Sequence, residues 1–137
     1  MMEINENTID FVLKGLQTTF NKSFSSKEEI SLTLKKAENW CKDGTLEKEL
    51  YGLSRDNKKC FQIVFYALNE DEEQKFFDYQ RKNIIKYQVS KGILFFNQYK
   101  NLCFLKNLLK SLKNEESYEV LNSLPLEIQN SLREEKL

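Results

Sequence analysis

The stretch SKEEISLTLKKAENWCKDG, residues 26–44, decides the fold because it contains the start, the buried face and the end of one amphipathic helix. Ser26 and Glu29 have the spacing of a capping box, in which each side chain satisfies a free amide at the helix start. Gly44 follows the last turn, where glycine commonly ends a helix. Between these signals one face repeats at helical spacing through Ile30, Leu34, Ala37 and Cys41, with Trp40 beside it. The stretch therefore predicts a helix that packs one side against a core.

The segments on either side have the same helical pattern. Upstream, spacings of three and four predict a first helix, capped by Asn7 or Thr8, that contains Ile9, Val12, Leu13, Leu16 and Phe20. Downstream, a shorter helix begins after Thr45, closes at residues 55–57 and contains Leu46, Leu50 and Leu53. Helix thus follows helix with only short polar turns between them.

Residues 60–68 are apolar nearly all round, which is typical of either a buried helix or a buried strand. An isolated strand is not stable, and the sequence offers no convincing second strand to pair with this one. The segment therefore favours a buried helix, although its β-branched and aromatic residues would also suit a strand.

The second half of the chain also predicts helices. Acidic residues 70–73 suit a helix start, because the helix dipole favours negative charge there, and this helix contains Phe76, Phe77, Ile84, Ile85 and Tyr87. A sixth helix runs from Ser90 to Leu112 with a bend near Asn101, and residues 113–117 break it. Two short helices follow, one over residues 118–123 and one, after Pro125 in its first turn, over residues 126–134.

These elements together predict the fold class. One proline and four glycines in 137 residues are too few for the turns of a β-sandwich or barrel. Successive helices with short connections instead predict an all-α protein of antiparallel helix pairs, stacked as a short HEAT-like α-solenoid. We expect one helical-repeat domain over residues 1–137, with a polar tail over 1–8 and a helix-proline-helix element over 117–137.

The composition excludes several classes of function. Charged residues are 31% of the chain and sum to a net charge of zero, so no overall field draws the protein to nucleic acid or to an anionic membrane. The chain has no histidine, the usual general base and the commonest metal ligand. Its three cysteines are far apart and indicate buried, reduced thiols. We expect no enzymatic activity, no cofactor and no metal site.

The sequence also bears on where in the cell the protein is expected. Neither a signal peptide nor an apolar stretch of about 20 residues is visible. We therefore expect an intracellular protein of the cytoplasm or nucleus with no membrane partner.

Residues Ile9 to Leu68 resemble the amino-terminal HEAT-like repeats of the importin-β, or karyopherin, superfamily, most closely its transportin-SR branch. The family's first helix has the form hydrophobic-x-x-hydrophobic-x-x-Leu-Gln, and its match here is Ile9, Val12, Leu13, Leu16 and Gln17. Its Ala-x-x-Trp-Leu element is similar to Ala37 and Trp40, with Cys41 where leucine is common. The apolar helix of its next repeat resembles residues 60–68, and its Leu-x-x-Leu-Pro-Glu-Glu element resembles residues 121–127.

The resemblance implies a non-enzymatic scaffold that binds a Ran-type GTPase through the inner, second helices of its repeats. Helical phase places polar side chains on those helices, and we expect a partner-binding surface made of Lys35, Lys36, Asn39, Lys59 and Gln62. Members of the family have many more repeats, so this chain would supply only part of the surface that encloses cargo.

Residues 117–132 also resemble a short ubiquitin-binding motif, in which a Leu-Pro break joins two small helices. In that interpretation Leu124, Pro125 and Ile128 dock against the apolar patch of ubiquitin. The alternative is a helix-turn-helix corner with Leu124 in the core and Pro125 in a first helical turn. Both interpretations stay open.

Basic and aromatic residues alternate over residues 75–100, and they include Arg81, Lys82, Lys86, Tyr87, Lys91 and Lys100. Such a pattern can form a face for RNA, with stacking on exposed tyrosine, as in a small factor docked on a ribosome. It is also typical of an ordinary solvated helix face, and acidic residues 70–73 and Asp78 dilute its charge. A ribosome or RNA is therefore the alternative partner to a protein.

Overall fold

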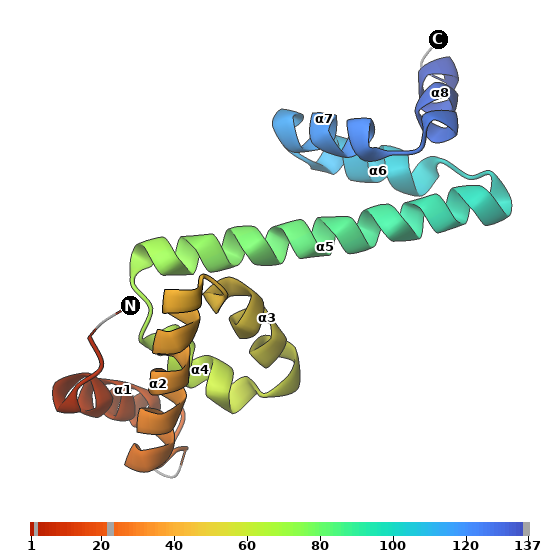
Figure 1. Ribbon diagram of the computed structural model, residues 1–137. Helices are drawn as coiled ribbons and strands as arrows, with labels where there is room; N and C mark the ends of the chain where they lie inside the picture. Colours follow the sequence, from red (N-terminus) through yellow and green to blue (C-terminus); the bar gives the residue numbers. More distant parts are fainter. Residues whose placement is uncertain (2, 22–23, 136–137) are drawn as a thin grey trace. The chain divides into compact units, whose positions relative to one another are not determined.

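The computed structural model describes residues 1, 3–21 and 24–135, and these residues form eight helices and no strand (Figure 1). The prediction of an all-α protein is confirmed. The helices are α1 (Glu6–Thr19), α2 (Lys27–Asp43), α3 (Leu46–Asp56), α4 (Lys58–Tyr66), α5 (Glu70–Tyr99), α6 (Cys103–Ser111), α7 (Asn114–Ser123) and α8 (Leu126–Glu135).

The chain forms two compact units. Unit 1 is Met1–Arg81 and unit 2 is Lys82–Leu137, so the boundary lies within α5. Each unit has its own set of buried apolar residues. The stacking of antiparallel pairs in a single HEAT-like solenoid stays a prediction.

The ends of α2 lie where its sequence predicts. The Ser26 hydroxyl accepts a hydrogen bond from the Glu29 amide at 3.2 Å, which satisfies an amide that has no partner inside the helix. Gly44 ends the helix in the left-handed region, with φ of 73°, where the absence of a Cβ removes the steric cost.

The start of α1 differs from the prediction of a cap at Asn7 or Thr8. The cap is Asn5, whose side chain accepts a hydrogen bond from the Thr8 amide at 3.1 Å. Thr8 lies inside the helix and is buried, and its hydroxyl donates to the Glu3 carbonyl. The helix therefore begins within the segment predicted as a polar tail.

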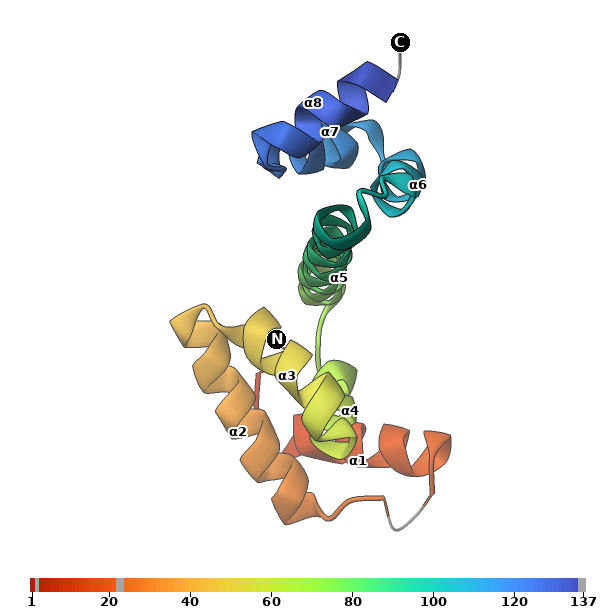
Figure 2. The same cartoon turned by 90° about the vertical axis from the view of Figure 1, so that its right-hand side faces the viewer.

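The apolar segment 60–68 is mostly helical, as the sequence favours. Asn57 ends α3 and also caps α4, because its side chain accepts a hydrogen bond from the Cys60 amide at 3.2 Å. In unit 1, α4 contacts α1, α2 and α3 (Figures 1 and 2). This central place explains why α4 is apolar on nearly every side.

Two apolar clusters form the core of unit 1. The first joins α1, α2 and the end of α4 through Ile9, Val12, Leu16, Ile30, Leu34, Ile63 and Ala67. The second contains Ala37, Leu46, Leu50, Val64 and Phe76, with Trp40 and Cys41 partly buried against it. The predicted face of α2 thus packs inward, with Trp40 beside it.

The prediction of two separate helices before and after residue 90 is wrong, because α5 continues without interruption for 30 residues. Ser90 can begin a helix, but an apolar row crosses it at spacings of four, four and three through Ile85, Val89, Ile93 and Phe96. The predicted bend near Asn101 is a full break. Lys100 has a φ of 52°, and the Asn101 side chain accepts a hydrogen bond from the Cys103 amide at 2.8 Å.

Unit 2 places α6, α7 and α8 around one core, made of Phe96, Leu102, Leu105, Leu124, Ile128 and Leu132 (Figure 2). The Ser117 hydroxyl donates to the Leu109 carbonyl at 3.1 Å and so links α7 to α6. The Gln129 side chain donates to the Leu124 carbonyl at 2.8 Å and holds the corner between α7 and α8.

Candidate functional site

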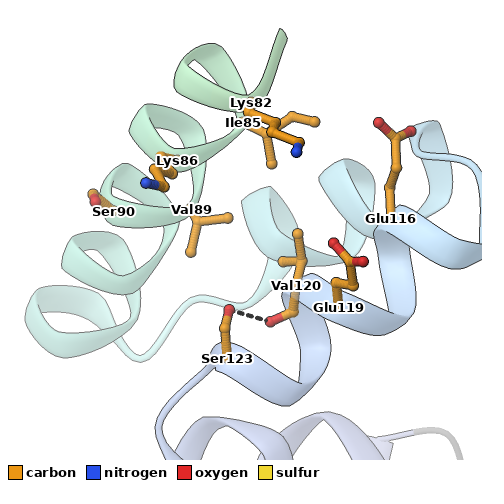
Figure 3. A pocket seen from close by; sticks show the side chains of 9 residues that line it. All are labelled: Lys82, Ile85, Lys86, Val89, Ser90, Glu116, Glu119, Val120 and Ser123. Carbon is orange, nitrogen blue, oxygen red and sulfur yellow. Dashed lines mark hydrogen bonds between the residues drawn. The ribbon is translucent and has the colours of Figure 1, made fainter. Parts of the chain in front are cut away.

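A groove lies between α5 and α7 within unit 2, and we call it the α5–α7 groove (Figure 3). Its volume is about 550 Å³, which is within the range of ordinary ligand sites. The nine lining residues are Lys82, Ile85, Lys86, Val89, Ser90, Glu116, Glu119, Val120 and Ser123.

The floor of the groove is apolar. Val89 and Val120 project into the space between the two helices (Figure 3). Val120 is only 8% exposed, and Val89 packs against the core of unit 2, so both are held in place from below. A ligand that covers this floor gains apolar burial without any need to reorder these side chains.

The two walls carry opposite charges. Lys82 and Lys86 lie one turn apart on α5, while Glu116 and Glu119 lie one turn apart on α7. The Glu116 carboxylate accepts a hydrogen bond from the Lys113 amide at 3.2 Å, which fixes it at the start of α7. Among the residues that the structure describes, Lys82, Lys86 and Glu119 have no ion-pair partner. Their charges are thus available to a ligand.

The two serine hydroxyl groups at the groove differ in their hydrogen bonding. The Ser123 hydroxyl donates to the Val120 carbonyl at 2.7 Å and so is engaged inside its own helix (Figure 3). Ser90 is exposed at the edge of the α5 wall. The lining therefore offers apolar contact, ion pairing and hydrogen bonding to a bound molecule.

The partner-binding residues expected in the first half of the chain all lie in unit 1. Lys35, Lys36 and Asn39 are exposed on α2, and Gln62 is half-buried on α4. Lys59, also on α4, forms an ion pair of 2.9 Å with Glu29 on α2. Its hydrogen bond lowers the pKa of the Glu29 carboxyl, and the Lys59 charge is thus partly neutralised within the protein.

The three residues of the ubiquitin interpretation are not equally accessible. Leu124 is 3% exposed and Ile128 is 1% exposed, and both belong to the core of unit 2. Pro125 is exposed directly before α8. Surface docking through Leu124 and Ile128 would therefore require this core to open, whereas Pro125 is open to contact as it stands.

The basic and aromatic residues at the end of α5 contact one another. Lys91 Nζ lies 5.8 Å from the ring centroids of both Phe95 and Phe104, within the distance of a cation–π interaction. Lys100 Nζ lies 4.8 Å from the Phe96 ring centroid and 3.6 Å from a Glu127 carboxylate oxygen. These lysines are engaged within unit 2, while Lys82 and Lys86 are among the residues that line the groove.

The sequence places Lys82 and Lys86 only within a basic run, and its pattern does not single out Glu119 or Val120. The signal that could have found the groove is the pair of like charges one turn apart on each helix. That signal becomes informative only once α5 and α7 are known to face one another across a groove. No such pairing can be read from the local pattern of either helix.

Comparison with protein-family models, with curated proteins and with solved structures gives no match for this chain. None of the helices in the described residues combines the length and the apolar character needed to cross a membrane. In residues 1, 3–21 and 24–135, no group of three or more side chains could hold a metal ion.

Proposed function

We propose that the protein is a non-enzymatic binding module and that another protein docks in its α5–α7 groove. The observation that carries this proposal is an apolar floor between two walls of opposite charge, with three charged side chains unpaired. Interfaces combine an apolar centre with a polar rim in this way.

The two kinds of contact contribute differently to binding. Covering the floor supplies the affinity, at roughly 25 cal/mol for each Å² of apolar surface that leaves water. The charged walls supply specificity and orientation, because a partner with the wrong charge meets a like charge at close range. A partner protein satisfies both requirements over the length of the groove.

The test is affinity purification from the native cell with three forms of the full chain. Ile85→Glu places a charge among the apolar side chains that line the groove and should remove the partners that dock there. Leu94→Glu is the matched control, because Leu94 is 52% exposed on the same helix and does not line the groove. Circular dichroism of each variant checks that its helices remain folded.

The proposal is supported if a defined set of proteins binds the wild type and Leu94→Glu but not Ile85→Glu. It fails if Ile85→Glu retains every partner of the wild type while folding normally.

A second candidate partner is a Ran-type GTPase bound at α2. The observation that favours this surface is the exposure of Lys35, Lys36 and Asn39 on one helix, where a partner can reach all three. We expect binding of the GTP-bound form only, and loss of binding in the double variant Lys35→Glu/Lys36→Glu. Lys48→Glu, an exposed position on α3, is the control. Unchanged binding in the double variant would remove this surface from consideration and leave the groove untouched.

A further inference from the structure

We infer that the occupant of the α5–α7 groove is an amphipathic helix of a partner protein, with acidic residues along one edge and basic residues along the other. This inference rests on the proposed function and adds the conformation and the charge pattern of the partner. The acidic edge lies along Lys82 and Lys86, the basic edge lies along Glu119, and the apolar stripe covers Ile85, Val89 and Val120.

The helical conformation follows from the chemistry of the walls. Both walls are helices, whose backbone amide and carbonyl groups are bonded within the helix itself. An extended peptide in such a groove would leave its own backbone groups without partners on either side, which is costly. A helix satisfies its backbone internally and presents only side chains to the groove.

A polyproline segment does not fit the lining. Domains that bind proline-rich peptides use grooves lined with aromatic rings. None of the nine residues that line this groove is aromatic. The lining consists instead of aliphatic and charged side chains, as expected where an apolar stripe and two polar edges are bound.

The spacing of the charges sets the pattern of the partner. Lys82 and Lys86 are about 6 Å apart along the axis of α5, at 1.5 Å per residue. Acidic residues four positions apart on a docked helix have the same separation and can pair with both lysines. The lined part of α5, residues 82–90, spans about 12 Å, so roughly two turns of the partner fill the groove.

The opposing carboxylates argue against nucleic acid as the occupant. Glu116 and Glu119 lie on the wall opposite the lysines and would repel a phosphate backbone held at Lys82 and Lys86. A helix with two differently charged edges turns the Glu119 carboxylate into a favourable contact.

The experiment measures binding of synthetic helical peptides to the purified full chain by fluorescence anisotropy. Each peptide has about 18 residues, long enough to form a helix, and the same leucine stripe. The mixed-edge peptide has glutamate on one edge and lysine on the other. The control peptides have lysine on both edges or glutamate on both edges. We expect the mixed-edge peptide to bind at least about tenfold more tightly than either control.

Charge reversal in the protein provides the decisive comparison. In Lys82→Glu/Lys86→Glu, both walls are acidic. The mixed-edge peptide should then bind about tenfold more weakly, and the control peptide with lysine on both edges should bind more tightly than it binds the wild type. Leu94→Glu should change neither affinity, because Leu94 does not line the groove.

Equal affinities for the three peptides, no binding of any of them, or no effect of the double reversal would overturn the inference. If cellular partners still depend on Ile85 in that case, the groove binds a protein of another conformation and the proposed function stands. If the mixed-edge peptide binds as expected but Ile85→Glu keeps every cellular partner, the proposed function fails instead.

Discussion

Gly92 of α5 lies against the Leu105 side chain of α6. A Cβ at this position would lie 2.7 Å from Leu105 Cγ and closer still to Leu105 Cδ2, and Leu105 is completely buried. Gly92→Ala should therefore lower the free energy of unfolding by about 1–2 kcal/mol, because the overpacking outweighs the better helix propensity of alanine. Urea unfolding followed by circular dichroism measures the change.

Gly52 provides the matched control, because it also lies inside a helix and has no atom within 4 Å of the position of a Cβ. Gly52→Ala should raise the free energy of unfolding by up to about 1 kcal/mol. A stabilising effect of both alanines would show that the contact between Gly92 and Leu105 is not tight.

The cysteine thiols should differ in reactivity. Burial raises the pKa of the Cys41 thiol, and so does the Glu72 carboxylate, whose oxygen lies 3.7 Å from the sulfur. Cys103 is exposed. Since the thiolate is the reactive form, a disulfide reagent near pH 8 should modify Cys103 several-fold faster than Cys41.

Mass spectrometry of the partly modified protein assigns each reacted cysteine. In Cys103→Ser the fastest phase should disappear, whereas in Cys41→Ser it should persist. The reverse result would contradict the burial of Cys41.

Single residues show what can be predicted from local sequence. The caps Ser26 and Gly44 could be predicted because a cap acts on amides within a few residues of itself. The predicted cap of α1 is wrong because Asn5, Asn7 and Thr8 all suit that position, and the local pattern does not show that the Asn5 side chain accepts a hydrogen bond from the Thr8 amide. The packing of Gly92 could not be predicted, because its neighbour Leu105 comes from another helix.

At the level of elements, the ion pair between Lys59 and Glu29 connects α4 to α2. Its side chains are 43% and 37% exposed, so Lys59→Gln should lower the free energy of unfolding near neutral pH by at most about 1 kcal/mol. Lys48→Gln, an exposed lysine of α3, is the control.

The same pair should depend on pH in a defined direction. The Lys59 hydrogen bond lowers the pKa of Glu29 in the folded protein below its ordinary value of 4.5. The ion pair therefore stabilises the fold fully at a pH above the ordinary pKa of Glu29. This stabilisation is lost as the pH falls through the lowered pKa of Glu29 in the folded protein. The difference between wild type and Lys59→Gln should shrink in this acidic range. A difference that stays constant down to full acid unfolding would count against the pair.

The corner between α7 and α8 separates core packing from surface contact. Leu124→Ala should lower the free energy of unfolding by about 2–5 kcal/mol, because it leaves a cavity in the core of unit 2. Pro125→Ala changes an exposed residue and should have a much smaller effect on stability.

Ubiquitin binding can be tested with the same two variants. Loss of binding in Leu124→Ala alone, together with its loss of stability, would reflect damage to the fold. Loss of binding in a stable Pro125→Ala would support a direct contact with ubiquitin.

Elements could be predicted where one apolar stripe repeats without change. The stripes of α1, α2 and α3 gave helices at nearly the observed positions. The continuity of α5 could not be predicted, because Ser90 suits a helix start and only the apolar row from Ile85 to Phe96 shows that the helix continues.

For the whole molecule, the separate cores of the two units predict separate responses to mutation. Leu105→Ala removes a completely buried side chain from unit 2 and should cost about 2–5 kcal/mol there. Hydrogen exchange should accelerate in α6 and α8, while amides of α1 and α2 keep their protection. Equal acceleration in both units would show that they unfold as one cooperative body.

Fold class and candidate site differ in how far the sequence determines them. Helical periodicity is a local property, so the all-α class could be predicted from it. The α5–α7 groove depends on which helices lie side by side, and that is decided by the buried residues that unit 2 brings together from α5, α6, α7 and α8. Only this arrangement brings Lys82 and Lys86 to the same groove as Glu116 and Glu119.

Trp40 is the only tryptophan in the chain, and it lies partly buried against the core formed by Ala37, Leu50 and Phe76. Its emission is therefore an intrinsic optical reporter of unit 1. When indole is excited selectively, the Trp40 emission should shift to longer wavelength when that core opens. Conformational changes confined to unit 2 should leave this emission unchanged. Bound peptides without tryptophan can thus be titrated into the groove while the same sample shows whether the other core stays intact.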